Sequence, residues 1–155
     1  MIRIVVILVV VPLVQIWACT CLEDERTPQR AADRAAAVFT GTVLSISNAV
    51  PEVTGRLGSN RVATVSRRPL ASPSRIVLLR VGETLSGVPT GQAEVEVATS
   101  MSECGFRFEA GQQFFVYAYR NPEGKLHTNI CTRTRPIEKA AEDLAYLRAA
   151  ARHRP

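Results

Sequence analysis

The apolar and polar residues that follow position 37 alternate mostly with the two-residue period of β-strands. Five segments rich in β-branched and aromatic residues predict strands: Val38 to Ser47, Arg75 to Leu85, Gln92 to Ala98, Gln112 to Tyr119 and Lys125 to Thr132. The third segment alternates most clearly, with Ala93, Val95 and Val97 on one face and glutamates on the other. Five strands in so short a chain predict a small, highly curved sheet or a barrel.

Two helices are predicted to flank these strands. Thr27 is a good N-cap and Pro28 suits a first helical turn, which favours a short helix over Gln29 to Ala37. Near the end of the chain the pattern changes to helical spacing, which predicts an amphipathic helix over residues 136–150. The adjacent acidic residues on that helix, Glu142 and Asp143, are expected to form a solvated face.

The connections carry their own signals. Gly41 marks a bulge or bend inside the first strand, and Asn121 to Gly124 is typical of a turn before the last strand. Residues Asn48 to Ser74 are rich in glycine, proline and serine, and predict a long exposed loop with a weak hairpin around Val62 to Val65. Loops of this length in compact domains are usually functional or mobile.

The N-terminal residues have the layout of an export signal. A positive start is followed by the apolar run Ile4 to Ile16 and by a small residue before Cys19. We therefore expect a signal peptide over residues 1–18 and a single secreted or periplasmic domain over residues 19–155. The apolar run is shorter than the ~20 residues of a spanning helix, so the mature protein is expected to have no transmembrane segment. The residues before Cys19 also loosely resemble a lipoprotein signal, so a lipid anchor on Cys19 is the alternative.

Composition and charge narrow the possible partners. The 155 residues are 46% hydrophobic and 21% charged, with a net charge of +5, as in ordinary globular proteins. The stretch between Glu52 and Glu83 contains arginines without acidic or aromatic residues. It therefore lacks the stacking platform of single-strand binders, and Tyr117 and Tyr119 are expected to be half-buried, so no nucleic acid partner is expected.

The sequence contains no recognisable catalytic constellation. Its two histidines are His127, in a predicted strand and expected to be structural, and His153, in the basic tail. There is no metalloprotease, nucleophile-elbow, phosphate-loop or dinucleotide motif. We therefore expect a monomeric non-enzyme that needs no cofactor.

Cysteines carry the strongest chemical signal. The four of them, Cys19, Cys21, Cys104 and Cys131, predict two disulfides in an exported chain. A bond between Cys19 and Cys21 would close a tiny, strained ring, so each is expected to pair with a distant partner, and two pairings remain open. A structural zinc site is the competing interpretation, but the paired Cys-x-x-Cys spacing is missing.

Several short segments, taken in order, resemble the N-terminal domain of the tissue inhibitors of metalloproteinases, within the wider netrin-like group. They are Cys19-Thr20-Cys21, Phe39-x-Gly41-x-Val43, Ser102-x-Cys104-Gly105, Phe114 to Tyr119, and Gly124 to Thr128 followed by Cys131. The resemblance spans nearly the whole mature chain and implies a mainly β, five-stranded OB-type barrel with a short N-terminal and a C-terminal helix. A third disulfide and a cysteine-rich second domain are missing, as in the shorter exported bacterial relatives, whose targets the resemblance does not supply.

The resemblance also implies a site at the mature N-terminus. It implies the pairs Cys19 with Cys104 and Cys21 with Cys131, and a Cys19 amine and carbonyl oxygen that chelate the zinc of a bound metalloprotease. Because residues i and i+2 of an extended segment point the same way, Thr20 would face away from the barrel toward a partner's pocket. The inhibitory contact would then comprise Cys19, Thr20 and Cys21. The alternatives are that Cys-x-Cys only fixes a loose terminus, and that the domain is an extracellular or envelope interaction module.

Overall fold

A computed structural model of the chain describes residues 19–21, 27–49 and 73–152. The predicted signal peptide, most of the predicted long loop and its Val62 to Val65 hairpin lie outside the described residues. In chain order the elements are α1 (Pro28–Arg34), β1 (Ala37–Asn48), β2 (Ser74–Ser86), β3 (Glu94–Ser100), β4 (Gln113–Arg120), β5 (Leu126–Thr128), β6 (Arg135–Pro136), the 3-10 helix η2 (Ile137–Lys139) and α2 (Ala141–Arg152).

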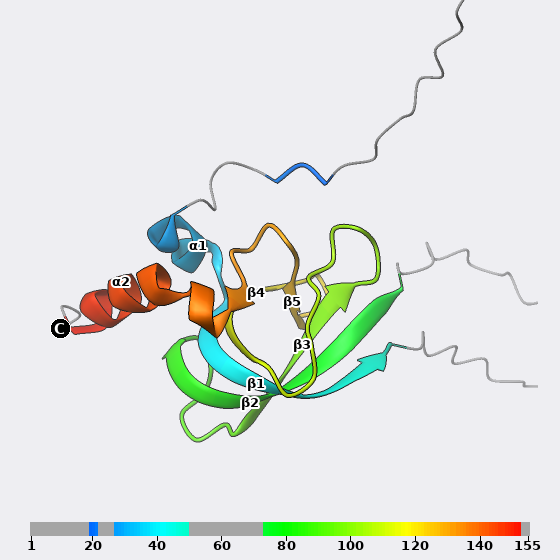
Figure 1. Ribbon diagram of the computed structural model, residues 1–155, viewed down its shortest axis with the longest axis horizontal. Helices are drawn as coiled ribbons and strands as arrows, with labels where there is room; N and C mark the ends of the chain where they lie inside the picture. The colour runs from blue at the N-terminus through cyan, green and yellow to red at the C-terminus, as the bar shows by residue number, and fades with distance from the viewer. Residues whose placement is uncertain (1–18, 22–26, 50–72, 153–155) are drawn as a thin grey trace, which may run out of the picture.

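Strands β1 to β5 form a closed barrel (Figure 1). Their order is β1-β2-β3-β5-β4, and the ring closes where β1 pairs with β4. All these pairings are antiparallel except that of β3 with β5, in which Ala98 lies opposite His127. The two-residue strand β6 pairs with Phe114 and Phe115 of β4, on the edge opposite β1. The predicted mainly β fold, a five-stranded barrel with a short N-terminal and a C-terminal helix, is therefore confirmed.

Strand β1 bends (Figure 1), and its register with β2 is irregular around Gly41. Its register with β2 shifts between Val38 and Phe39 and again between Phe39 and Gly41. A Cβ atom at position 41 would lie 3.1 Å from Leu79 Cβ, so a larger residue would crowd the barrel interior. The bend allows β1 to pair with β2 along its length and with β4 over Ala37 to Thr42, as the predicted bulge requires.

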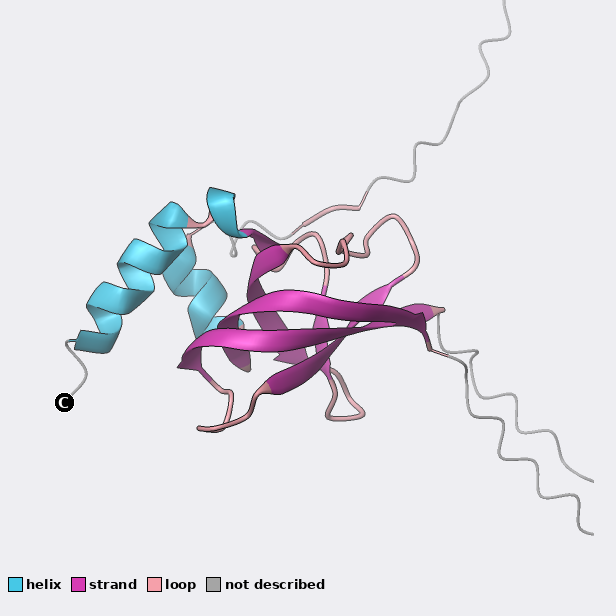
Figure 2. Cartoon of the chain, turned by 60° about the horizontal axis from the view of Figure 1, so that its bottom comes forward, coloured by secondary structure: helices cyan, strands magenta, loops and turns pink. Residues whose placement is uncertain are grey.

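The alternation of side chains along β1 and β4 produces two separate apolar cores. Inside the barrel lie Phe39 and Val43 of β1 with Phe114 and Val116 of β4, and the Phe114 ring contacts two further rings edge-on. On the outer face, Val38, Phe115 and Tyr117 pack against Ala31 of α1 and Ala140 before α2. Both helices lie on this one side of the barrel (Figure 2). The cysteines belong to neither core.

Most strand predictions differ from the structure by one or two residues at each end, but three elements need correction. The first helix ends at Arg34 rather than Ala37, because Ala37 already pairs with Ala118 in the sheet. Strand β5 ends at Thr128 rather than Thr132, because a turn follows in which the Asn129 carbonyl oxygen accepts the amide of Thr132. The C-terminal helix starts as the 3-10 turn η2 and continues to Arg152.

Candidate functional site

Two disulfides fix the Cys19-Thr20-Cys21 segment to the barrel. Cys19 is bonded to Cys104, with 5.5 Å between their Cα atoms, and Cys21 is bonded to Cys131, with 5.2 Å between theirs. This is the pairing that the resemblance implies, and no cysteine is left free. The bonds span 85 and 110 positions of sequence, so they join residues 19–21 to loops in the second half of the barrel.

The two cysteines that receive the segment lie on neighbouring loops. Cys104 follows β3 and Cys131 follows β5, the two strands that pair in parallel. The amide of Ile130 donates a hydrogen bond of 3.1 Å to the carbonyl oxygen of Cys104, which holds the loops side by side. The N-terminal segment is therefore bonded across one end of the barrel, where β3 and β5 both finish.

Local sequence shapes each of these loops. In the first, the amide of Gly105 donates to the Ser102 carbonyl oxygen, and an added Cβ at position 105 would lie only 1.7 Å from the Ser100 carbonyl oxygen. In the second, the Asn129 side-chain oxygen accepts the amide of Cys131 at 2.8 Å. Glycine at position 105 and asparagine at position 129 therefore position the two cysteines.

Exposed apolar side chains accompany the segment. Among the described residues the exposed large hydrophobic side chains are Ile46, Met101, Ile130 and Tyr146. Of these, Met101 is 43% exposed on the Cys104 loop, and Ile130 is 46% exposed beside Cys131. Thr20 and Cys21 are exposed, and Cys19 is half-buried. We call Thr20, Met101 and Ile130, with the two disulfides, the terminal face. The sequence analysis did not identify Met101 and Ile130. Their only signal in the sequence is that each is a single apolar residue in a polar loop near a cysteine.

Hydrogen bonds do not reinforce the two disulfides in the described ranges. Within residues 19–21, 27–49 and 73–152, no hydrogen bond joins Cys19, Thr20 or Cys21 to another part of the chain. An open hollow adjoins the segment and is lined by Thr20, Cys21, Arg34, Tyr119, Asn129, Cys131 and Thr132. Two of the lining residues are hydrogen-bonded to each other, since the Asn129 amide donates to the Tyr119 hydroxyl at 3.4 Å. The terminal face therefore borders an open hollow.

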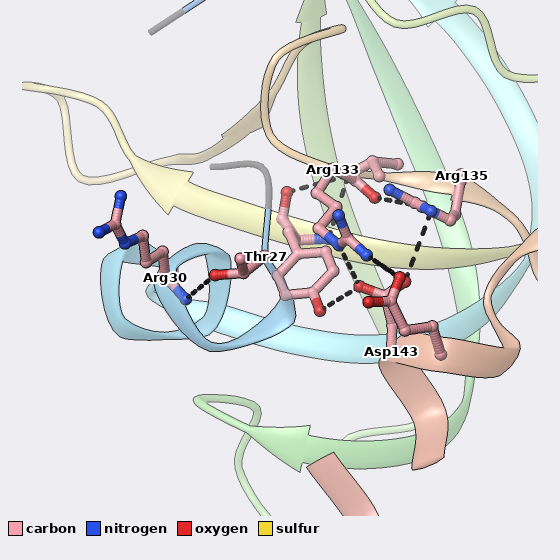
Figure 3. Close-up of polar contacts among 8 residues, drawn as sticks. Thr27, Arg30, Arg133, Arg135 and Asp143 are labelled. Atoms are coloured by element: carbon pink, nitrogen blue, oxygen red, sulfur yellow. Dashed lines mark hydrogen bonds and ion pairs between the residues drawn. The ribbon is translucent and has the colours of Figure 1, made fainter. Parts of the chain in front are cut away.

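A second polar feature, a buried charged cluster, fastens the C-terminal helix (Figure 3). The Asp143 carboxylate accepts the Tyr117 hydroxyl at 2.7 Å and the Arg133 Nε at 2.6 Å, and lies 3.6 Å from an Arg135 nitrogen. Glu142 pairs with Arg133 from the exposed side. The expectation that both acidic residues face solvent is wrong for Asp143, which is fully buried, because three donors on the barrel compensate its charge.

The same cluster shifts two titrating groups. Burial and the hydrogen bond to Asp143 raise the pKa of the Tyr117 hydroxyl far above its ordinary value. Burial acts to lower the pKa of Arg133, but the bonds to Asp143 and Glu142 outweigh it and raise that pKa overall. Arg133 adopts a φ of 63°, a left-handed conformation that non-glycine residues seldom take. The cluster therefore holds a costly backbone conformation by charge pairing.

His127 is a half-buried residue of β5. Its ring centroid lies 5.2 Å from that of Tyr119, and its Nδ1 is a buried atom without a hydrogen-bond partner. Burial lowers the pKa of this imidazole, which favours its neutral form. His153 lies outside the described residues, so the two histidines are not brought together in the part of the chain that the structure describes.

The described residues hold neither a metal cluster nor a membrane-spanning helix. They contain no group of three or more His, Cys, Asp or Glu side chains arranged to hold a metal ion. No helix in those ranges has the length and apolar character needed to cross a membrane. Comparison with protein-family models gave no match, and neither did comparison with curated proteins. The disulfide-bonded barrel is typical of small domains that work in an extracellular or periplasmic environment.

Proposed function

We propose that this domain inhibits zinc metalloproteases through its mature N-terminus. The observation that carries the proposal is the exposed Cys19-Thr20-Cys21 segment, tied at both cysteines with Thr20 exposed between them. The mechanism requires export and cleavage before Cys19, which leave a free α-amine. An ordinary α-amine has a pKa of about 8, so an appreciable neutral fraction exists near neutral pH.

In this mechanism the ligand atoms come from a single residue. The amine nitrogen and carbonyl oxygen of Cys19 close a five-membered chelate on the zinc of the bound protease. Thr20 enters the adjoining pocket of the protease. Two disulfides support this role because they fix the segment in advance and so reduce the entropy lost on docking.

The exposed side chains of the terminal face support a docking role. Met101 and Ile130 lie on the two loops that receive the disulfides, and both are more than two-fifths exposed. Apolar side chains beside the chelating residue would contact the walls of a protease cleft. Within this proposal the domain itself is a monomeric non-enzyme that holds no cofactor, and the only metal involved is the partner's zinc.

The decisive experiment blocks the amine and leaves everything else unchanged. The mature domain beginning at Cys19 is assayed against a panel of zinc proteases beside a variant with one alanine added before Cys19. The extended variant should lose inhibition, because an acylated nitrogen has no lone pair for zinc. Circular dichroism and non-reducing peptide mapping should show that both proteins have the same fold and the same disulfides.

A side-chain variant tests the second part of the mechanism. Thr20→Gly should weaken inhibition about 10- to 100-fold, because it removes one small side chain from the pocket and leaves the chelate. Intact mass of the exported protein shows whether Cys19 is lipidated, and lipidation would rule out the mechanism. If the alanine-extended domain inhibits as well as the native one, the amine has no role.

The second candidate function is a protein-interaction module without zinc chelation, favoured by the exposed Met101 and Ile130. In that case Met101→Ser and Ile130→Ser would weaken binding to a partner, whereas the added alanine would have little effect. The added alanine therefore separates the two candidates, because it abolishes inhibition under the first and leaves binding nearly unchanged under the second.

A further inference from the structure

The N-terminal segment differs from the rest of the barrel in how it is held. Each strand is held by backbone hydrogen bonds to its neighbours, whereas in the described ranges residues 19–21 make no hydrogen bond to the barrel and are bonded to it by two disulfides. If both bonds opened, no hydrogen bond within those ranges would keep the segment in place. Its attachment therefore depends on the redox state of four sulfur atoms.

Both bonds are open to attack. Each joins an exposed cysteine to a half-buried one: Cys104 to Cys19, and Cys21 to Cys131. Thiol–disulfide exchange requires a thiolate to reach one sulfur of the pair, and an exposed cysteine permits this. The sequence alone showed the cysteines but not which of them are accessible.

Core packing and strand pairing stabilise the barrel without involving the cysteines. Its interior core comprises twelve buried residues and its outer core five, and no cysteine belongs to either. The strand ring closes through the pairing of β1 with β4, which the disulfides do not supply. Opening the bonds therefore removes a constraint from the terminal segment without exposing either core.

We propose that residues 19–21 form a redox-releasable arm: a dithiol reductant detaches the arm and switches off the terminal face, while the barrel remains folded. One thiolate of the reductant attacks an exposed cysteine sulfur, and the half-buried partner leaves as a thiolate that takes up a proton. The second thiolate of the reductant then attacks the first reductant sulfur and displaces the exposed cysteine as a thiolate, which also takes up a proton, so the reductant becomes a disulfide. Each protein disulfide gains two electrons and two protons, and no other bond changes.

The structural test uses the mature domain from Cys19 to Pro155 and dithiothreitol. After reduction, the thiols are blocked with iodoacetamide, and the reagents are removed. Four modified cysteines should appear by mass spectrometry, while cooperative thermal unfolding is retained at a lower midpoint. An aminopeptidase should then trim the arm, as seen by intact mass, whereas the oxidised protein should lose no residue.

Matched serine variants separate release from the chemistry of the reagents. The pairs C19S/C104S and C21S/C131S each keep one bond, so trimming should stop at the remaining bonded cysteine. The variant with all four cysteines changed to serine should be folded and should be trimmed without any reductant. Loss of cooperative unfolding in this variant and in the reduced protein would show that the barrel needs the bonds, and an arm that resists trimming would show another attachment; either result overturns the proposal.

The effect of reduction on inhibition rests on the proposed function and is measured separately. In the reduced and blocked protein, the inhibition constant should rise at least about tenfold as preorganisation is lost. If the arm is released but the oxidised domain inhibits no protease, the inhibitory function fails and the redox-releasable arm remains. If the released form inhibits as well as the oxidised form, the arm does not control the terminal face and the switch is wrong.

Discussion

The start and the end of the described domain are fastened to the same barrel by opposite kinds of chemistry. The Cys19-Thr20-Cys21 segment is exposed and held by covalent bonds, whereas α2 is held by packing and by the buried carboxylate of Asp143. A disulfide needs no burial, so it can hold a segment that presents its side chains to a partner. A buried ion pair needs every partner in place, so it suits a helix whose task is to cover a core.

This difference indicates which changes should destabilise each region. The terminal face should respond to reductants and to changes in the two loops that receive its cysteines. The helical side should respond to the loss of any one member of the Asp143 cluster. Four variants or conditions, ordered from the largest expected effect to the smallest, test this division.

Removing the buried carboxylate should have the largest effect. Asp143→Ala leaves Arg133 and Arg135 without their shared partner, and leaves the Tyr117 hydroxyl unpaired, so unfolding free energy should fall by about 3–5 kcal/mol. Urea unfolding measures the change. Glu142→Gln, on the exposed side of the same cluster, is the matched control and should cost less than about 1 kcal/mol. Equal costs for the two variants would contradict the comparison.

Removing one disulfide should cost somewhat less. The pair C21S/C131S opens the longer cross-link, and unfolding free energy should fall by about 2–4 kcal/mol, mainly because the unfolded chain gains freedom. The native fold should persist, as reported by far-ultraviolet circular dichroism. A variant that is unfolded in the absence of denaturant would mean that the disulfides also support the two apolar cores.

A glycine pair tests the loop that receives Cys19. Gly105→Ala should cost about 1–3 kcal/mol, because its Cβ would lie 1.7 Å from the Ser100 carbonyl oxygen and the Cys104 loop must move. Gly91→Ala is the control: its φ is +84° with no atom within 4 Å of the new Cβ, so only backbone strain of about 1 kcal/mol is added. Gly105→Ala should also make Cys104 easier to reduce, which mass spectrometry after mild reduction measures. An unchanged midpoint of reduction would show that the loop does not control the bond.

The smallest effect should come from acid, through the half-buried His127 of β5. Burial lowers its pKa in the folded state, so the unfolded chain binds the proton first as pH falls below the ordinary histidine value of about 6.5. Stability from this group is therefore complete above that pH and is lost as pH falls toward the lowered pKa, by at most about 1.4 kcal/mol per pH unit. Thermal unfolding from pH 7 to 5 should show a flatter profile for His127→Gln, and His153→Gln is the control. Identical slopes in the native and His127→Gln proteins would refute this assignment.

The parts of the fold that follow from the local residue pattern could be predicted from the sequence. Period-two alternation placed four of the strands within one or two residues, Gly41 marked the bulge in β1, and Asn121 to Gly124 formed the turn before β5. These features depend mainly on neighbouring residues, whose types and spacing favour a local backbone conformation and set which side chains share a face. The even number of cysteines, in the same way, indicated two cross-links but left their pairing to the resemblance.

Contacts between distant parts of the chain decided the rest. Helix α1 stops at Arg34 because Ala37 pairs with Ala118 of β4, which is distant in sequence. Strand β5 is short because a turn containing Cys131 follows it. Asp143 carries the same pattern as a solvated helix residue, yet it is buried because Tyr117, Arg133 and Arg135 converge on it only after the barrel closes. Burial and ion pairing depend on which surfaces meet, and one-dimensional spacing does not contain that information.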